Sequence, residues 1–149
     1  MSVTTAPSPA PEAEAPSALE AAYRRYHAAW EANDPERIAD LHSADSVFWM
    51  HDGSAAIEGR ENLRRHYRQL FEQYESLVWE SGRVMFGEGR WLYDYTLLVR
   101  AKDAGGAPFT ARIDMVDVVH VNADQEVTWK EVFVDSAATQ AARRRAGTA

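Results

Sequence analysis

The stretch FTARIDMVDVVHV, residues 109–121, decides the fold class of this 149-residue chain. Its alternate residues are apolar with a single exception, and the series is Phe109, Ala111, Ile113, Met115, Asp117, Val119 and Val121. Because side chains two positions apart share one face of a strand, the stretch predicts a strand with one buried face. Asp117 is the one acid on that face.

A carboxyl group that is buried alone is costly to ionise, so its pKa rises and it keeps its proton. In that state Asp117 could donate a hydrogen bond or transfer a proton at neutral pH. Two other interpretations stay open. A β-bulge could turn the side chain outward, or an Arg or Lys partner could make Asp117 one half of a structural ion pair.

The chain before this strand carries the signals of helices. Ser17 and Glu20 have the spacing of a capping box, which predicts a helix that starts at Ser17. Apolar and aromatic residues then recur at helical intervals as far as Trp30. Asp34 and Pro35 suit the cap and the first position of a short second helix.

Strand signals dominate the rest of the chain. A short strand, SVFWMH at residues 46–51, precedes a third helix that is expected after Gly59. Beyond it, four β-like segments separated by turn sequences cover residues 77–86, 90–102, 109–121 and 127–134. Three helices followed by a run of antiparallel strands predict an α+β fold. We expect a cone-shaped α+β barrel, with three N-terminal helices packed on a curved, mainly antiparallel sheet.

Composition sets the domain limits and excludes several classes of function. Residues 1–16, rich in Pro, Ala and Glu, predict a disordered leader, residues 17–136 a single domain, and residues 137–149 a flexible C-terminal tail. The net charge of −7 argues against nucleic-acid binding and against an anionic membrane surface. Without cysteine the chain has no thiol chemistry. No secretory signal is recognised at the N-terminus, so we expect a cytoplasmic protein.

Helices and curved strands of this kind enclose a hollow, and the aromatic residues provide material for its lining. Tyr26 stands out because it carries a hydroxyl on the inward stripe of the first helix. If that hydroxyl met a protonated Asp117, the two donors could stabilise the oxygen of an enolate. A core tyrosine bonded to a backbone carbonyl is an equally good interpretation of the pattern.

Three segments resemble a known superfamily. YHAAWEANDPERIADLHSADS (26–46) is followed by a strand, a DGS turn and AIEGRENLRRHY (56–67), and VDVVHVNADQEVTWKEVFVD (116–135) resembles a closing hairpin. Together they resemble the nuclear transport factor 2-like superfamily, which includes the ketosteroid isomerases and the SnoaL-like polyketide cyclases. The resemblance covers roughly residues 19–135.

The resemblance implies roles for individual residues. Tyr26 matches the oxyanion tyrosine of the ketosteroid isomerases, and Asp117 matches their protonated aspartate. Asp117 also resembles the acid–base aspartate of the SnoaL-like cyclases. The isomerase base would fall on Met50, which cannot transfer a proton, so the cyclases are the better match. His51, with an ordinary pKa of about 6.5, is the candidate for a second base, although a strand end before a turn also suits a solvated histidine.

A second resemblance favours a different reaction. Arg112-x-Asp114 and the segment Trp129-Lys130-Glu131 resemble parts of the limonene-type epoxide hydrolase site. Strand alternation disfavours this interpretation, because Arg112 and Asp114 share the face opposite to Asp117. An outward Arg112–Asp114 pair is therefore expected.

The leading hypothesis is a SnoaL-like enzyme for cofactor-free cyclisation or isomerisation of a small, apolar, oxygenated substrate. Asp117, Tyr26 and His51 are the candidate catalytic residues; the candidate substrate-binding residues are Trp49, Met50, Tyr67, Tyr93, Met115 and Trp30. We expect no metal and no cofactor. Exposed Val116 and Val118 predict a homodimer through the outer sheet face. The alternatives are an epoxide hydrolase or epoxide-opening cyclase, and a non-catalytic module that binds a small molecule.

Overall fold

The computed structural model describes residues 17–148, so the leader predicted for residues 1–16 lies outside the described residues. The helices are α1 (Ala18–Glu31), α2 (Pro35–Asp40), α3 (Arg60–Gln73) and α4 (Ser136–Ala146). The strands are β1 (His42–His51), β2 (Ile57–Glu58), β3 (Ser76–Gly87), β4 (Arg90–Lys102), β5 (Pro108–Val121) and β6 (Val127–Val134).

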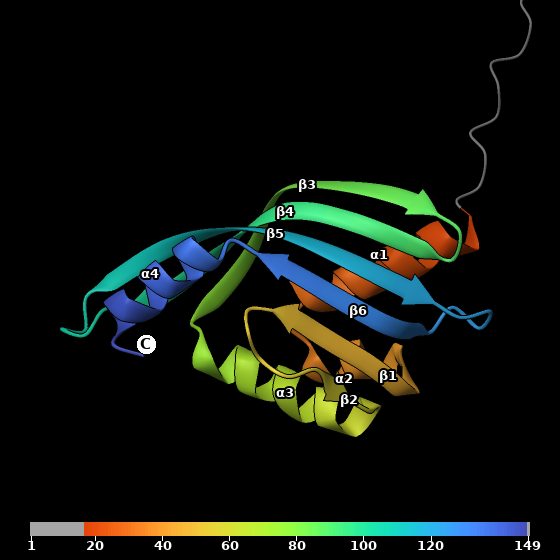
Figure 1. Cartoon of the computed structure of the whole chain (residues 1–149), viewed down its shortest axis with the longest axis horizontal. Helices are drawn as coiled ribbons and strands as arrows, with labels where there is room; N and C mark the ends of the chain where they lie inside the picture. Colours follow the sequence, from red (N-terminus) through yellow and green to blue (C-terminus); the bar gives the residue numbers. More distant parts are fainter. Residues whose placement is uncertain (1–16, 149) are drawn as a thin grey trace, which may run out of the picture.

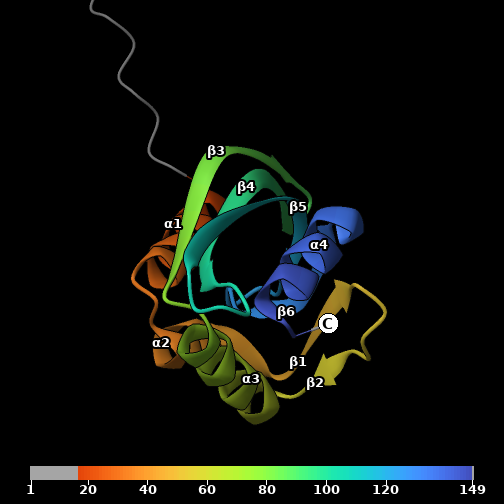
Figure 2. The same cartoon turned by 90° about the vertical axis from the view of Figure 1, so that its left-hand side faces the viewer.

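The strands form one sheet in the order β2-β1-β6-β5-β4-β3 (Figure 1). Every neighbouring pair is antiparallel except β1 and β6, which run parallel. The sheet is strongly curved, with α1, α2 and α3 along one side of it and α4 beside its end (Figure 2). The α+β class and the curved, mainly antiparallel sheet are as predicted.

The predicted caps begin the first two helices. The Ser17 hydroxyl accepts a hydrogen bond from the Glu20 backbone N–H at 3.1 Å. Asp34 accepts one from the Arg37 N–H at 3.0 Å, and Pro35 occupies the first turn of α2. Each cap satisfies a backbone donor that has no partner inside the helix.

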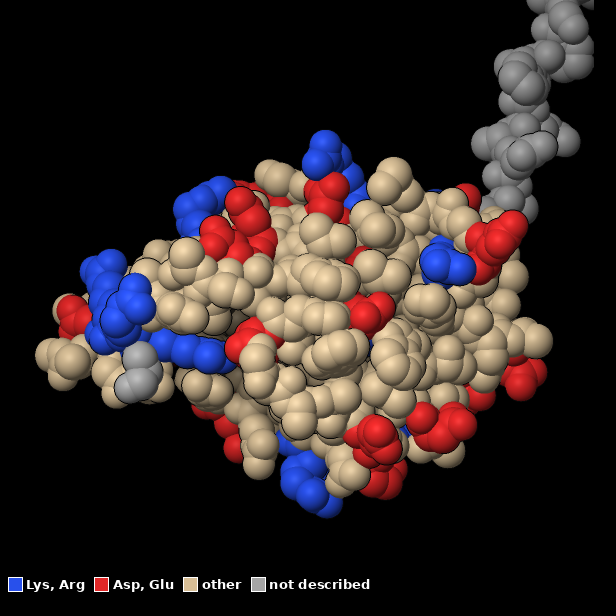
Figure 3. All heavy atoms as spheres, viewed as in Figure 1, with Lys and Arg blue, Asp and Glu red and all other residues tan. Residues whose placement is uncertain are grey.

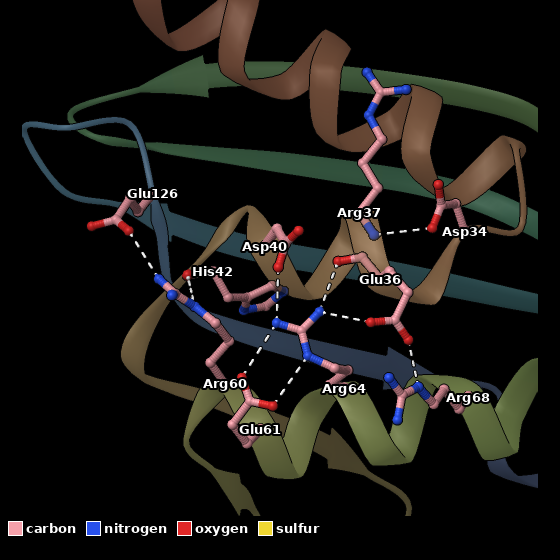
Figure 4. A network of polar contacts seen from close by, with 10 residues as sticks. All are labelled: Asp34, Glu36, Arg37, Asp40, His42, Arg60, Glu61, Arg64, Arg68 and Glu126. Carbon is pink, nitrogen blue, oxygen red and sulfur yellow. Dashed lines mark hydrogen bonds and ion pairs between the residues drawn. The ribbon is translucent and has the colours of Figure 1, made fainter.

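Arg64 ties α3 to α2 (Figure 4). Its guanidinium contacts Glu36 at 3.0 Å, Asp40 at 2.8 Å and Glu61 at 3.2 Å. Arg68 adds a further ion pair with Glu36. These ion pairs hold α2 and α3 against each other at the protein surface.

Strand β1 starts at His42, four residues before the predicted strand. His42 pairs with Val127 of β6, and a register shift lies between His42 and Val47. The irregularity interrupts the alternation of side chains, which is why the pattern indicated only the second half of the strand.

The tail predicted as flexible from residue 137 contains helix α4. Asp135 caps it by accepting a hydrogen bond from the Ala138 N–H at 3.0 Å, and Gly147 ends it with a φ of 70°. No side chain of α4 is fully buried. The helix therefore lies against the domain without entering its core.

Candidate active site

A cavity of about 350 Å³ lies between the concave face of the sheet and the helices. Its wall is mostly aromatic and aliphatic, with side chains from α1, α3 and every long strand. Strand β5 contributes Ile113, Met115 and Asp117 to the lining, as the alternation of its residues predicts. An apolar hollow with few polar groups is the usual form of a small-molecule site.

Asp117 is not alone in the cavity. Its Oδ2 lies 3.0 Å from Nζ of Lys130 on β6, and its Oδ1 accepts a hydrogen bond from the Tyr95 hydroxyl at 3.1 Å. Asp117 and Lys130 are only 6% and 4% exposed. The expectation that Asp117 is buried alone is therefore wrong, and the Lys partner that the sequence left open is present.

The neighbours of Lys130 favour its charged form. Burial is the largest single influence and lowers the pKa of Lys130, but the charges and hydrogen bonds of Asp117 and Tyr26 together outweigh it, so the pKa of Lys130 is raised overall. Lys130 is thus an ammonium group at neutral pH, and its Nζ faces the carboxyl group of Asp117. A buried pair of this kind repays its desolvation only when its remaining donors and acceptors are also satisfied.

Aromatic rings surround the ammonium group. Its Nζ lies 4.2 Å from the ring centre of Trp30, 5.3 Å from that of Tyr26 and 6.0 Å from that of Phe48. Cation–π attraction of this geometry is strongest where the cation is shielded from water. The rings therefore help to keep a charged group inside an apolar wall.

Tyr26 faces a buried histidine. The Tyr26 hydroxyl lies 3.0 Å from Nε2 of His42, the Tyr67 hydroxyl lies 3.3 Å from the same nitrogen, and Ser46 Oγ is 2.7 Å from Nδ1. Burial, and then the positive charges of Lys130 and Arg60, lower the pKa of His42 to about 3. A neutral His42 can accept a hydrogen bond from the nearer Tyr26 hydroxyl at Nε2 while its Nδ1–H donates to Ser46 Oγ.

Of the predicted substrate-binding residues, some line the cavity and others do not. Trp30, Met50, Tyr93 and Met115 line it. Tyr67 is fully buried behind the wall, where it bonds to His42. The predicted catalytic residues Asp117 and Tyr26 both line it as well.

Trp49 and His51 lie on the outer face of the sheet, and this corrects the roles predicted for them. Phe48 and Met50 of the same strand face inward, so the residues that alternate with them face outward. His51 stacks on Phe133 with ring centres 4.2 Å apart and contacts Glu131 at 3.2 Å. It is therefore remote from the inward-facing Asp117.

The side chains of Arg112, Asp114 and Glu131, which resemble parts of an epoxide hydrolase site, also lie outside the cavity. Arg112 pairs with Glu80 at 2.9 Å, and Asp114 accepts a hydrogen bond from the Thr96 hydroxyl at 2.7 Å. The two side chains face outward as expected, but they do not pair with each other, since Arg112 contacts β3 and Asp114 contacts β4. Glu131 pairs with His51 on the same outer surface.

Sequence reasoning missed Lys130, although the signal was present. Lys130, Val132 and Val134 alternate along β6, and all three line the cavity. Reading alternate residues of this strand, as for the one that carries Asp117, would have placed a lysine on its apolar face. His42 carried no such signal, because the irregular start of β1 hides its direction.

Two features of residues 17–148 bear on other classes of site. Within this range no three His, Asp or Glu side chains gather in a way that could hold a metal ion. None of the helices described here combines the length and apolarity needed to cross a membrane.

The comparisons with solved structures support the fold. A provisionally assigned SnoaL-like polyketide cyclase from Shewanella denitrificans matches with a TM-score of 0.73 at 12% identity, over 83% of this chain and 94% of that one. The BvnE pinacolase of Penicillium brevicompactum matches with 0.72 at 14% identity, over 87% and 94%. A protein of ketosteroid isomerase-like fold from Catenulispora acidiphila, in complex with trimethylamine, matches with 0.69 at 16%, over 86% and 93%.

Sequence comparison gives the family. No curated protein matches the chain. The family model for the SnoaL-like domain, however, matches residues 23–129, which include the helices α2 and α3 and most of the sheet. The chain therefore belongs to the SnoaL-like domain family.

Proposed function

We propose that the protein is an enzyme that cyclises or isomerises a small, apolar, oxygenated, polyketide-like substrate by proton transfer, without a cofactor. The observation that supports this most is the Asp117–Lys130 ion pair, which is buried in the wall of an otherwise apolar cavity. Enolate chemistry needs a base, and it needs a donor for the oxygen on which charge develops. The pair offers both.

In the proposed reaction, the Asp117 carboxylate removes a proton from a carbon next to a substrate carbonyl. The electron pair of the broken C–H bond moves toward the carbonyl oxygen, where the Lys130 ammonium stabilises the enolate. In isomerisation, Asp117 returns the proton to another carbon of the conjugated system. In cyclisation, the enolate carbon forms a bond to a second carbonyl carbon of the same molecule, whose oxygen then receives the proton from Asp117.

The tyrosines position this pair. Burial and then the charge of Asp117 raise the pKa of Tyr95 well above its usual range, so Tyr95 keeps its proton and donates to Asp117. Tyr26 is directed by His42 and lies beneath the Lys130 ammonium. We therefore assign Tyr26 a positioning role through Lys130, in place of the direct contact with the substrate oxygen that the sequence suggested.

A second candidate function is supported by the same pair. A buried carboxylate that is matched by a lysine and a tyrosine can be purely structural. The cavity would then hold an apolar ligand without converting it, and the protein would be a binding module.

The experiment that separates the two functions uses 2-tetralone, a bicyclic ketone with acidic C–H bonds next to its carbonyl. We expect the protein to accelerate exchange of these protons in D₂O, followed by NMR. Asp117→Asn should lower the enzymatic rate by about 100-fold or more, the range of general-base contributions.

The matched control is Asp114→Asn, which makes the same change of charge on the outer face of the same strand. It should leave the exchange rate within about twofold, since Asp114 does not line the cavity. Equal rates for wild type and a folded Asp117→Asn variant would reject catalysis and leave the binding module.

A further inference from the structure

Arg143 of α4 brings a second cation to the cavity. Both Arg143 and Asp52 belong to its lining, together with Ser54 and Thr139. Nη2 of Arg143 lies 3.3 Å from Oδ2 of Asp52, and the other carboxylate oxygen accepts a hydrogen bond from the Ser54 N–H at 3.0 Å. A single, long contact thus joins the guanidinium to the carboxylate.

This contact is weak enough to be exchanged. The Arg143 side chain is 46% exposed although that of Asp52 is only 10% exposed, and solvent at the guanidinium screens the attraction between the two charges. A carboxylate from a ligand could approach the guanidinium with both oxygens and form two parallel hydrogen bonds, which is the stronger geometry. Asp52 therefore holds Arg143 toward the cavity without saturating it.

The surroundings of Arg143 favour an anion. Helix α4 ends in three successive arginines and contains no acidic residue, whereas the whole chain carries a net charge of −7. In Figure 3 these cations gather at the end of the molecule where α4 lies in Figure 1. The Arg145 guanidinium lies 4.4 Å from the ring centre of Phe109, which helps to hold α4 against the sheet. Local positive potential of this kind draws anions toward the site.

The sheet register places the two polar groups at opposite ends of an apolar wall. Val132 pairs with Asp117 on one side and with Met50 on the other, and Asp52 lies two residues beyond Met50. Asp52 is therefore displaced from Asp117 by about 7 Å along the strands. Across the strands it is displaced by two spacings of about 4.8 Å each. The distance from the ion pair to Arg143 is thus on the order of 10 Å.

We propose that Arg143 binds a carboxylate at the outer end of the substrate, while the reacting carbonyl faces Lys130. The substrate class is then an apolar keto acid, with its acid group and its reacting carbonyl at opposite ends. This inference rests on the proposed function for the position of the carbonyl. The contact with the carboxylate follows from the cavity and α4 alone.

The test measures binding by isothermal titration calorimetry to the full chain. The probes are aromatic carboxylic acids of one to three fused rings, each with its methyl ester, so that the members of a pair differ mainly in charge. We expect wild type to bind at least one acid more tightly than its ester. Arg143→Gln should weaken that acid roughly fivefold and leave the ester unchanged.

Two further variants sharpen the test. Arg144→Gln removes the same charge from the next residue of α4, which does not line the cavity, and should leave the preference for the acid intact. Asp52→Asn removes the competing carboxylate and should tighten binding of the acid. The proposal is overturned if no acid binds more tightly than its ester, if Arg143→Gln weakens both equally, or if Arg144→Gln has the same effect.

These outcomes are separate from those of the exchange assay. If Asp117→Asn leaves exchange unchanged while the Arg143-dependent preference persists, the proposed catalysis fails and the carboxylate site stands. If exchange depends on Asp117 but acids and esters bind alike, the carboxylate site fails and the proposed catalysis stands.

Discussion

At the scale of single residues, His42 makes the stability of the protein depend on pH. Its pKa is lowered to about 3 in the folded chain, whereas an unfolded histidine titrates near 6.5. Between these values the unfolded state binds the extra proton, so the stabilisation that is present above pH 6.5 is lost as the pH falls. We expect the free energy of unfolding to drop by about 2 kcal/mol between pH 7 and pH 5 from this group.

Urea unfolding of wild type and of His42→Gln at the two pH values measures this effect. The variant is expected to be less stable at pH 7, because it loses fully buried packing, but to lack most of the additional loss at pH 5. An identical loss in both proteins would show that His42 is not the group responsible.

Residue-scale prediction succeeded where alternation was regular. The inward face of β5, including Asp117, followed from the sequence, and so did the outward direction of Arg112. The contact between Asp117 and Lys130 did not follow, because Lys130 lies on the neighbouring strand of the sheet. Strand pairing is a tertiary property, and a single sequence does not determine which strands become neighbours.

At the scale of elements, Arg64 is expected to stabilise the α2–α3 pair. Its side chain is only 14% exposed and contacts acids on both helices. Arg64→Gln should lower the free energy of unfolding by about 1–2 kcal/mol, because it breaks several charge-assisted hydrogen bonds at once. Arg65→Gln, at the exposed next position of α3, is the control and should change it by less than about 0.5 kcal/mol. Equal effects of the two substitutions would contradict this role.

Element limits could be predicted where a local signal marks them. The Ser17 and Asp34 caps fixed the starts of α1 and α2, because capping is encoded within four residues. The first half of β1 was missed, since its register shift is set by pairing with β6. The segment of α4 was expected to be a flexible tail, at most a frayed helix, because its few contacts with the domain come from distant residues such as Asp52 and Phe109.

At the scale of the whole molecule, the outer face of the sheet is the proposed homodimer surface. We define the outer patch as Trp49, His51, Val116, Val118 and Phe133. Trp49 and Phe133 are 38% and 45% exposed, whereas Val116 and Val118, which were expected to be exposed, are half-buried. Figure 3 shows that the middle of this side of the molecule is largely uncharged. Exposed apolar strand faces are commonly covered by a partner.

Sedimentation equilibrium tests the dimer. Wild type is expected to sediment as a dimer, and Phe133→Glu as a monomer, because a charge would be buried at the centre of the interface. Met85→Glu, which changes an exposed methionine on the edge strand β3, is the control and should remain dimeric. A monomeric wild type at high micromolar concentration would reject the dimer.

In the proposed mechanism Asp117 and Lys130 act on the substrate as one unit. A double-mutant cycle that measures the 2-tetralone exchange rate tests this coupling. Asp117→Asn, Lys130→Gln and the double variant are compared with wild type, each confirmed as folded by circular dichroism. We expect either single substitution to remove nearly all of the enzymatic exchange rate, and the double variant to be no slower than the two single variants. A folded Asp117→Asn protein that exchanges as fast as wild type would contradict it.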